Sequence, residues 1–219
     1  ADHRNARRRP DETSQHAQAV GTPPAVPEHP FRRRRRARVE AWRRLPWWRF
    51  AQSLAQMSEA NSTMKPTPVR RRSAARLAVV QMSYQGQMSG QSVAEFLPVF
   101  LQHYSEDIRK SFRVKALDSG HLNELAMAVE ARRDEFDDIL TGCLAEGWTL
   151  DRMTVIDRAV LRAGTCELVS MPHLPARAVV SEYAALADVC GCDVGFINAI
   201  LDRVARDARR VEMDPKSGG

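Results

Sequence analysis

The stretch Val69–Gln85, VRRRSAARLAVVQMSYQ, places three consecutive arginines directly before an apolar run. Its hydrophobic residues recur at intervals of three and four, which predicts a helix over about Ser73–Gln85. The same spacing continues along the rest of the chain, and strand-like alternation is almost absent. The sequence therefore predicts an all-α fold of six or seven helices, in two helical subdomains that meet near Gly147–Asp151.

This first predicted helix has two unlike sides. At 100° per residue, Arg72, Arg76 and Ser83 fall opposite an apolar side formed by Ala74, Leu77, Ala78, Gln81 and Tyr84. Arginines in a first turn are disfavoured by the helix dipole, whereas a phosphate group would complement both the arginines and the positive end of the helix. The pattern favours contact with RNA or DNA, and a simply solvated charged face is the alternative.

Further helices are expected over about Ser92–Glu106, His121–Glu146, Arg152–Val169 and Pro175–Cys190. Pro98 is expected to kink or restart the first of these, and the third is expected to be the most buried. Asp193 is well placed to cap a last helix. The residues expected to face inward on that helix are Ile197, Ile200, Leu201, Val204, Ala208 and Val211.

Charge is unevenly distributed along the 219 residues, whose formal net charge is +6. Residues 1–63 contain 13 arginines, no lysine and 6 acidic residues, and they are rich in proline. We expect a disordered extension there, and it can lie upstream of a true start at Met57 or Met64. Residues 64–212 form the predicted folded domain, and residues 213–219 form a predicted disordered tail.

Several kinds of chemistry are set aside. No apolar run of 18 residues and no signal peptide is visible, so we expect a cytoplasmic protein with no membrane contact and reduced thiols. Cys190 and Cys192 lack the further ligands of a zinc site, and Glu135 and Asp138 are better explained by an exposed helix face. No nucleotide-binding loop is present. We expect no cofactor, no metal and no enzymatic activity.

Three segments carry a resemblance to a known family. RRSAARLAVVQMSYQ resembles the arginine-rich first helix of the NusB transcription antitermination factors. VIDRAVLRAGTCELVSMPHLPARAVVSEYAALA and GFINAILDRVAR resemble that family's C-terminal helices, so the similarity covers about Lys65–Arg210. The resemblance implies a non-enzymatic bundle of two helical subdomains. It also implies binding to single-stranded boxA RNA of ribosomal RNA leader transcripts, together with NusE, a small-subunit ribosomal protein. The pair would help to load an antitermination complex on RNA polymerase.

The resemblance implies RNA-binding roles for Arg70, Arg71, Arg72, Arg76, Tyr84, Asp193 and Phe196, and Arg203 joins this predicted set because its spacing from Phe196 places it on the same helix edge. The arginines would bind phosphates, and Tyr84 would stack on a base. Core roles for Tyr84 and Phe196 are the alternatives, and Phe196, Arg203 and Arg210 are expected to share one edge of the last helix. The alternative function is a helical module that docks an acidic protein partner without specific RNA recognition. A homodimer is left open.

Overall fold

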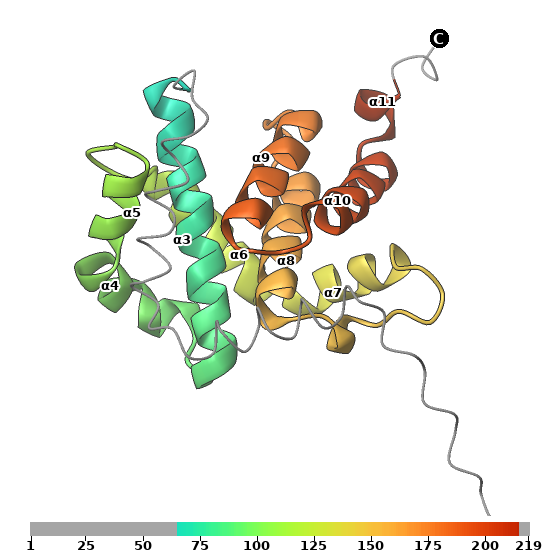
Figure 1. Ribbon diagram of the computed structural model, residues 1–219, viewed down its shortest axis with the longest axis horizontal. Coiled ribbons are helices and arrows are strands. Elements are labelled where there is room, and N and C mark those ends of the chain that lie inside the picture. The colour runs from blue at the N-terminus through green and yellow to red at the C-terminus, as the bar shows by residue number, and fades with distance from the viewer. Residues whose placement is uncertain (1–64, 215–219) are drawn as a thin grey trace, which may run out of the picture.

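A computed structural model describes residues 65–214, and the predicted N-terminal extension with its candidate start codons lies outside this range. Within the described range the prediction of an all-α fold is confirmed, since every regular element is a helix (Figure 1). The elements are α3 (Thr67–Ser89), α4 (Val93–His103), α5 (Ser105–Ser111), α6 (Ser119–Ala131), α7 (Arg133–Gly142), the 3-10 helix η1 (Leu150–Arg152), α8 (Val155–Ser170), α9 (Ala176–Val189), α10 (Val194–Ala208) and α11 (Arg210–Met213).

The described part holds nine α-helices, more than the six or seven expected, because three predicted helices are divided, the last of them into α10 and α11. Pro98 lies inside the continuous helix α4, and the break falls at Tyr104 instead. The predicted helix His121–Glu146 divides at Arg132, whose guanidinium donates to Ser170 Oγ on α8 at 2.6 Å. Neither of the breaks at Tyr104 and Arg132 carries a proline or a glycine, so local sequence gives no sign of them.

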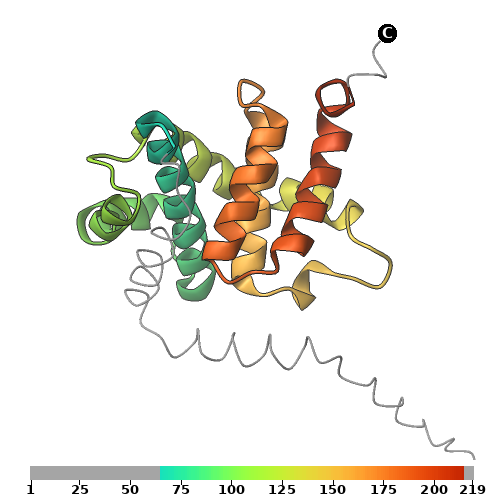
Figure 2. The same ribbon diagram turned by 45° about the horizontal axis from the view of Figure 1, so that its top comes forward.

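The central element is α8, which packs against α3, α6, α7, α9 and α10. Every residue from Ala159 to Leu168 is buried, which confirms the prediction that this helix is the most enclosed. Gly164 permits the closest packing of α8 on α10, because a Cβ atom there would lie 2.8 Å from Leu201 Cδ1. Figure 2 shows α8, α9 and α10 running side by side.

Two groups of helices share this core. α3, α4, α5 and α6 pack on one another, whereas α7 packs against α8 and α10 of the C-terminal group. The division therefore falls near Arg132, and the predicted junction near Gly147–Asp151 is wrong. The reason is that the loop after α7 carries the chain around the C-terminal group and does not lead from one group to the other.

The C-terminal segment secures the turn between α8 and α9. The Arg209 guanidinium donates to the carbonyl oxygens of Leu168 at 2.7 Å, Glu167 at 3.0 Å and Met171 at 2.7 Å. It thereby supplies extra donors to carbonyls at the C-terminal end of α8, where the helix itself provides few. Glu212 accepts a hydrogen bond from the first backbone N–H of α9.

This arrangement corrects one predicted helix. The four residues Ile197, Ile200, Leu201 and Val204 are buried as expected, but Val211 is 75% exposed and Ala208 is also exposed. α10 ends at Ala208, and the chain turns at Arg209 before α11. Met213, which was placed in the predicted tail, is buried at 3% exposure.

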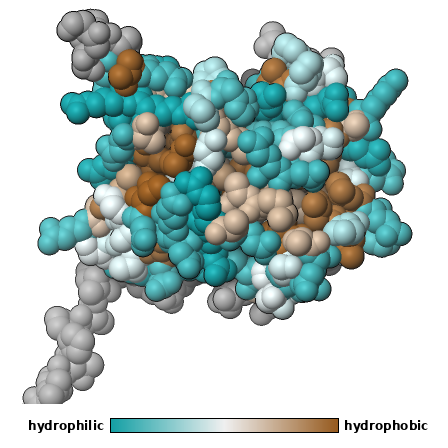
Figure 3. Space-filling view, turned by 180° about the vertical axis from the view of Figure 1, so that it is seen from behind, coloured by the Kyte–Doolittle hydropathy of each residue, from teal (hydrophilic) through white to brown (hydrophobic). Residues whose placement is uncertain are grey.

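The surface seen from behind is mostly hydrophilic, and its hydrophobic areas are small and separate (Figure 3). The large hydrophobic side chains that are exposed within the described range are spread over several elements, with two each on α3 and α4. They are Val69, Met88, Val99, Leu101, Met127, Trp148, Val194 and Val211. Scattered side chains of this kind are normal on a protein surface, so a functional surface is better sought among charged and aromatic groups.

Candidate functional site

The arginine cluster, Arg70–Arg72, lies at the beginning of α3 and contacts the loop between α5 and α6, residues 112–118. Arg70 Nη1 donates to the carbonyl oxygens of Phe112 at 2.9 Å and Arg113 at 2.8 Å. These carbonyls follow the end of α5, where the helix leaves acceptors without intrahelical partners. Arg70 therefore holds the end of α5 against the beginning of α3.

The other two arginines hold the second half of the same loop. Arg71 donates to the carbonyl oxygens of Ala116 at 3.2 Å and Leu117 at 3.1 Å. Arg72 Nε lies 3.5 Å from a carboxylate oxygen of Asp118, whose side chain also caps α6. The three arginines thus fix the loop along its whole length, a role that the sequence did not indicate.

Positive charge nevertheless remains available to solvent in this cluster. Arg71 is an exposed residue, and the side chain of Arg72 keeps 41% of its surface exposed despite its contact with Asp118. The first turn of α3 contains no acidic residue. Cationic side chains and the positive end of the helix dipole therefore face the same region, which suits an anionic ligand.

Arg76 does not belong to this surface. It is only 4% exposed, and its guanidinium binds both carboxylate oxygens of Glu167, at 2.8 Å and 2.7 Å. The prediction that Arg76 lies on a solvent-facing side of its helix is wrong, because other helices surround the middle of α3. Every residue from Ser73 to Val80 is buried, including the residues on both sides of the helical wheel.

Glu167 is the centre of a buried polar network between the two groups of helices. Its Oε1 atom lies 2.8 Å from His121 Nε2 and accepts a hydrogen bond from Tyr183 Oη at 3.0 Å. Burial alone would raise the pKa of Glu167, but hydrogen bonds from His121 and Arg76 outweigh it and hold that pKa below its ordinary value. Glu167 and Arg76 are therefore both charged, and they join α3 to α8.

Tyr84 is half-buried on the second half of α3. It lies twelve residues beyond Arg72, which corresponds to about 18 Å along the helix axis. It is neither fully enclosed in the core nor part of the arginine cluster. Both predicted roles for Tyr84, stacking on a base and packing in the core, therefore stay open.

The beginning of α10 carries two further predicted residues. The prediction that Asp193 caps this helix is confirmed, since its carboxylate accepts a hydrogen bond from Phe196 N at 3.0 Å. Phe196 is half-buried, and its ring lies 5.6 Å from the ring of Trp148. The aromatic pair joins α10 to the loop that follows α7.

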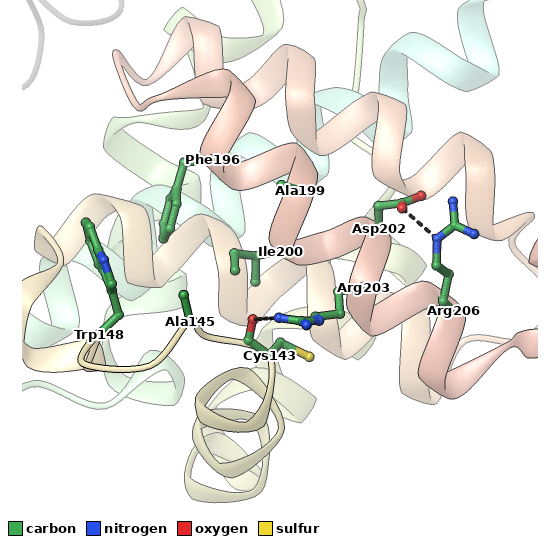
Figure 4. A pocket seen from close by; sticks show the side chains of 9 residues that line it. All are labelled: Cys143, Ala145, Trp148, Phe196, Ala199, Ile200, Asp202, Arg203 and Arg206. Carbon is green, nitrogen blue, oxygen red and sulfur yellow. Dashed lines mark hydrogen bonds and ion pairs between the residues drawn. The ribbon is translucent and has the colours of Figure 1, made fainter.

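These rings form one end of an open groove of about 570 Å³ (Figure 4). We call it the aromatic groove, and its lining includes Trp148, Phe196, Ile200 and Arg203. Arg203 Nη1 donates to the carbonyl oxygen of Cys143 at 3.0 Å, which fixes the guanidinium at the groove wall. Phe196 and Arg203 share this edge as expected, but Arg210 lies on α11 and does not extend it.

Trp148 was missed in the sequence, although a signal was present. It is the only tryptophan after residue 48, and its side chain is 40% exposed. A large aromatic residue left at the surface of the folded part is a frequent mark of a binding site. Arg152 also lies near its ring, at 5.8 Å from the centroid.

The predicted residues therefore fall into separate places. The arginine cluster lies at the beginning of α3, whereas Asp193, Phe196 and Arg203 lie on α10. In Figure 2 the beginning of α3 is at the upper edge of the body and the turn before α10 is at the lower edge. Any single ligand that contacts both must extend across the protein.

A metal site, a reactive thiol and a membrane span find no support in the described residues. No group of histidine, cysteine or acidic side chains in residues 65–214 is arranged to hold a metal ion. Cys190 is buried, and burial raises its pKa to about 12, which keeps it a thiol. Among these same residues no helix is long and apolar enough to cross a membrane.

Known proteins similar to this chain give one consistent picture. The family model described as "NusB family" matches residues 73–206. The transcription antitermination protein NusB of Sphingopyxis alaskensis is 40% identical over 141 residues, which cover 64% of this chain and 95% of that relative. NusB of Caulobacter vibrioides is 36% identical over 148 residues, covering 67% of this chain and 99% of the relative.

Solved structures agree at the level of the fold. T. maritima NusB superposes with a TM-score of 0.51 at 24% identity, covering 66% of this chain and 96% of that chain. A chain from the crystal structure of a plectonemic RNA supercoil gives a TM-score of 0.52 at 20% identity, covering 63% and 96%. The helices, the matched family model and the curated relatives together show that this chain belongs to the NusB family of transcription antitermination factors.

Proposed function

We propose that this protein is a non-enzymatic RNA-binding antitermination factor that recognises boxA-type leader RNA of ribosomal RNA operons. It would bind that RNA together with NusE and help to assemble the antitermination complex on RNA polymerase. Membership of the NusB family supports a role in transcription antitermination. The observation that carries the RNA contact is the arginine cluster near the beginning of α3, where Arg71 is exposed, Arg72 keeps 41% of its side chain exposed, and the preceding first turn has no acidic residue.

In this proposal Arg71 and Arg72 bind backbone phosphates. Arg70 is committed to the loop by its hydrogen bonds to Phe112 and Arg113, so its main contribution is to position the surface and add to its positive potential. Arg76 is left out because it is buried against Glu167. The arginine cluster therefore supplies affinity, and base recognition needs another part of the protein.

The aromatic groove is the candidate for that part. Phe196 and Trp148 offer ring faces on which an unpaired base can stack, and Arg203 lies at the same wall. Asp193 fixes the first turn of α10 and thereby the position of Phe196. Tyr84, on the second half of α3, is half-buried and offers a third ring between the arginine cluster and the aromatic groove. A single strand extending from α3 to α10 would contact all of these residues.

The test measures binding of the full 219-residue chain to a boxA RNA and to a scrambled RNA of equal length, each with and without NusE. Tighter binding to boxA that NusE strengthens is the expected result. Equal and weak binding to both RNAs, unchanged by NusE, would contradict the proposal. It would favour the alternative of a helical module that docks an acidic protein partner.

A further inference from the structure

A second cationic segment lies beside the arginine cluster. The run Arg109–Lys115, RKSFRVK, contains four basic residues and no acidic residue. It covers the last turn of α5 and the first part of the loop of residues 112–118. Because Arg70 and Arg71 hold this loop against α3, the two basic segments form one continuous surface although they are about forty residues apart in sequence.

The four basic residues of this run are not equivalent. Arg109 Nη1 donates to the carbonyl oxygen of Lys115, and Lys110 Nζ pairs with Glu106 at 2.8 Å. Arg113 and Lys115 are both exposed, and no carboxylate in the described part of the chain forms an ion pair with Lys115. The loop thus presents Arg113 and Lys115 to solvent.

The backbone of the loop explains why these two side chains point outward. Val114 and Leu117 are buried, at 9% and 7% exposure, and they anchor the loop to the core. Arg113 and Lys115 flank Val114 in the sequence and are exposed. Buried anchors together with hydrogen bonds from the arginine cluster hold the loop in one position, so its cations are arranged before any ligand arrives.

Arg113 occupies a position that normally favours glycine. Its φ angle is 51°, the left-handed region, and it follows the end of α5. Its N–H donates to the carbonyl oxygen of Lys110 at 3.0 Å, and Val114 N donates to that of Arg109 at 2.9 Å. This pair of bonds is a Schellman helix end, in which glycine avoids the strain that an arginine side chain introduces. A strained arginine in an exposed position points to a role for its side chain.

We propose that the loop of residues 112–118 is a second RNA-contacting element, in which Arg113 and Lys115 bind backbone phosphates of the strand that contacts Arg71 and Arg72. This proposal rests on the proposed function and extends its surface to residues outside the predicted set. RNA is favoured over an acidic protein because the loop continues the arginine cluster, and a regularly charged strand can follow such a surface. The contact is to phosphates and therefore carries affinity without sequence preference.

The experiment compares the full chain with the double variant Arg113→Ala/Lys115→Ala in titrations with boxA RNA at several salt concentrations. The control, Arg133→Ala/Arg210→Ala, removes the same charge from exposed positions on α7 and α11. We expect the loop variant to bind about tenfold more weakly and its salt dependence to fall by about 1.4 in slope, as for two phosphates of a single strand. The control variant is expected to show a smaller change in both the RNA affinity and the salt slope. The variant Arg113→Lys/Lys115→Arg should retain the affinity, because it retains both charges.

The outcomes separate this proposal from the proposed function. If the loop variant and the control bind RNA alike, the loop contact is wrong even where the wild-type chain discriminates boxA from a scrambled RNA. If the loop variant binds both RNAs more weakly but the wild-type chain does not discriminate them, the loop contact stands and boxA recognition is wrong. Unchanged RNA binding with weaker binding to a poly-glutamate peptide would assign the loop to an acidic partner and overturn the proposal.

Discussion

Arg76 on α3 and Glu167 on α8 form a two-point ion pair in the interior, with Nε to Oε1 at 2.8 Å and Nη2 to Oε2 at 2.7 Å. The side chain of Glu167 is 0% exposed and that of Arg76 is 5% exposed. An ion pair of this kind stabilises a fold less than its short distances suggest, because both charges lose their hydration. Removing the Glu167 charge alone is costly, because the buried Arg76 then keeps only the longer contact with Glu182 at 3.5 Å.

Glu167→Gln is therefore expected to lower the free energy of unfolding by about 3 kcal/mol, the low end for breaking a buried pair, because Glu182 still faces Arg76. The change keeps the shape of the side chain but removes the nearer counterion of the Arg76 guanidinium, so that only Glu182 Oε2, at 3.5 Å from Arg76 Nη1, still faces it. Urea unfolding followed by circular dichroism measures the effect. The matched control is Glu135→Gln, which removes an exposed partner of Arg132 and should change stability little. Equal stability of both variants would show that the buried pair is not needed to hold the helices together.

The same carboxylate predicts a dependence on pH. Its pKa in the folded protein lies below the ordinary 4.5, so its contribution to stability is fully present above about 4.5 and is lost as pH falls through that value toward the folded pKa. A protonated Glu167 resembles glutamine. The stability difference between the wild-type chain and Glu167→Gln is therefore expected to shrink in urea titrations taken from pH 7 down to pH 3. A difference that stays constant over this range would contradict the assigned charge state.

Arg72→Ala is expected to weaken RNA binding without unfolding the protein. Arg72 keeps 41% of its side chain exposed, and among residues 65–214 its acidic contact is Asp118 at 3.5 Å. Loss of one phosphate contact should reduce the slope of log affinity against log salt by about 0.7 for a single strand. Arg76→Ala should instead lower the melting temperature. If Arg72→Ala leaves both affinity and slope as they were, Arg72 is not a phosphate contact.

Gly164→Ala is expected to destabilise the protein by about 1–3 kcal/mol, as overpacking of a core commonly does. An added Cβ atom would lie 2.8 Å and 2.9 Å from the two methyl groups of Leu201, and 3.3 Å from the Tyr183 ring. Gly142→Ala serves as the control because a Cβ atom there meets nothing within 4 Å. Thermal melts of both variants measure the difference. A neutral Gly164→Ala would mean that α8 and α10 separate easily.

Arg113→Gly separates stability from binding. Glycine relieves the left-handed backbone at φ 51°, and part of this gain is offset by the greater freedom of glycine in the unfolded chain. We expect the free energy of unfolding to rise by about 0.5–1 kcal/mol, whereas RNA affinity falls because a cation is lost. A urea titration and an RNA titration on the same preparation test both halves. Lower stability would show that the arginine side chain supports the fold.

Sequence periodicity predicted the helical core well where one face of a helix is buried. On the last predicted helix, Ile197, Ile200, Leu201 and Val204 were expected to face inward, and all four are buried. The cap at Asp193 followed from residue type alone. These features depend on neighbours within a few residues, which is the range over which sequence patterns are informative.

The orientation of Arg76 could not be predicted in the same way. Other helices surround the middle of α3, so its polar residues are buried with partners that lie far away in sequence. The contacts of Arg70 and Arg71 were equally hidden, because their acceptors are backbone carbonyls of a distant loop and every residue type has one. Only the folded structure identifies which carbonyls lie near these arginines. From the sequence, the arginine run therefore indicated a binding surface and not a contact within the protein.

The hydrogen bonds from Arg209 to the end of α8 have a consequence for how the chain is made. Residues 209–212 are synthesised after α8 and α9, yet Arg209 and Glu212 supply the groups that close the turn between these helices. A nascent chain that ends at α10 therefore contains α8 and α9, but their connecting turn still lacks the hydrogen bonds from Arg209 and Glu212. We therefore expect a chain that ends before Arg209 to be cleaved faster by proteases than the full chain, because the turn between α8 and α9 lacks these hydrogen bonds.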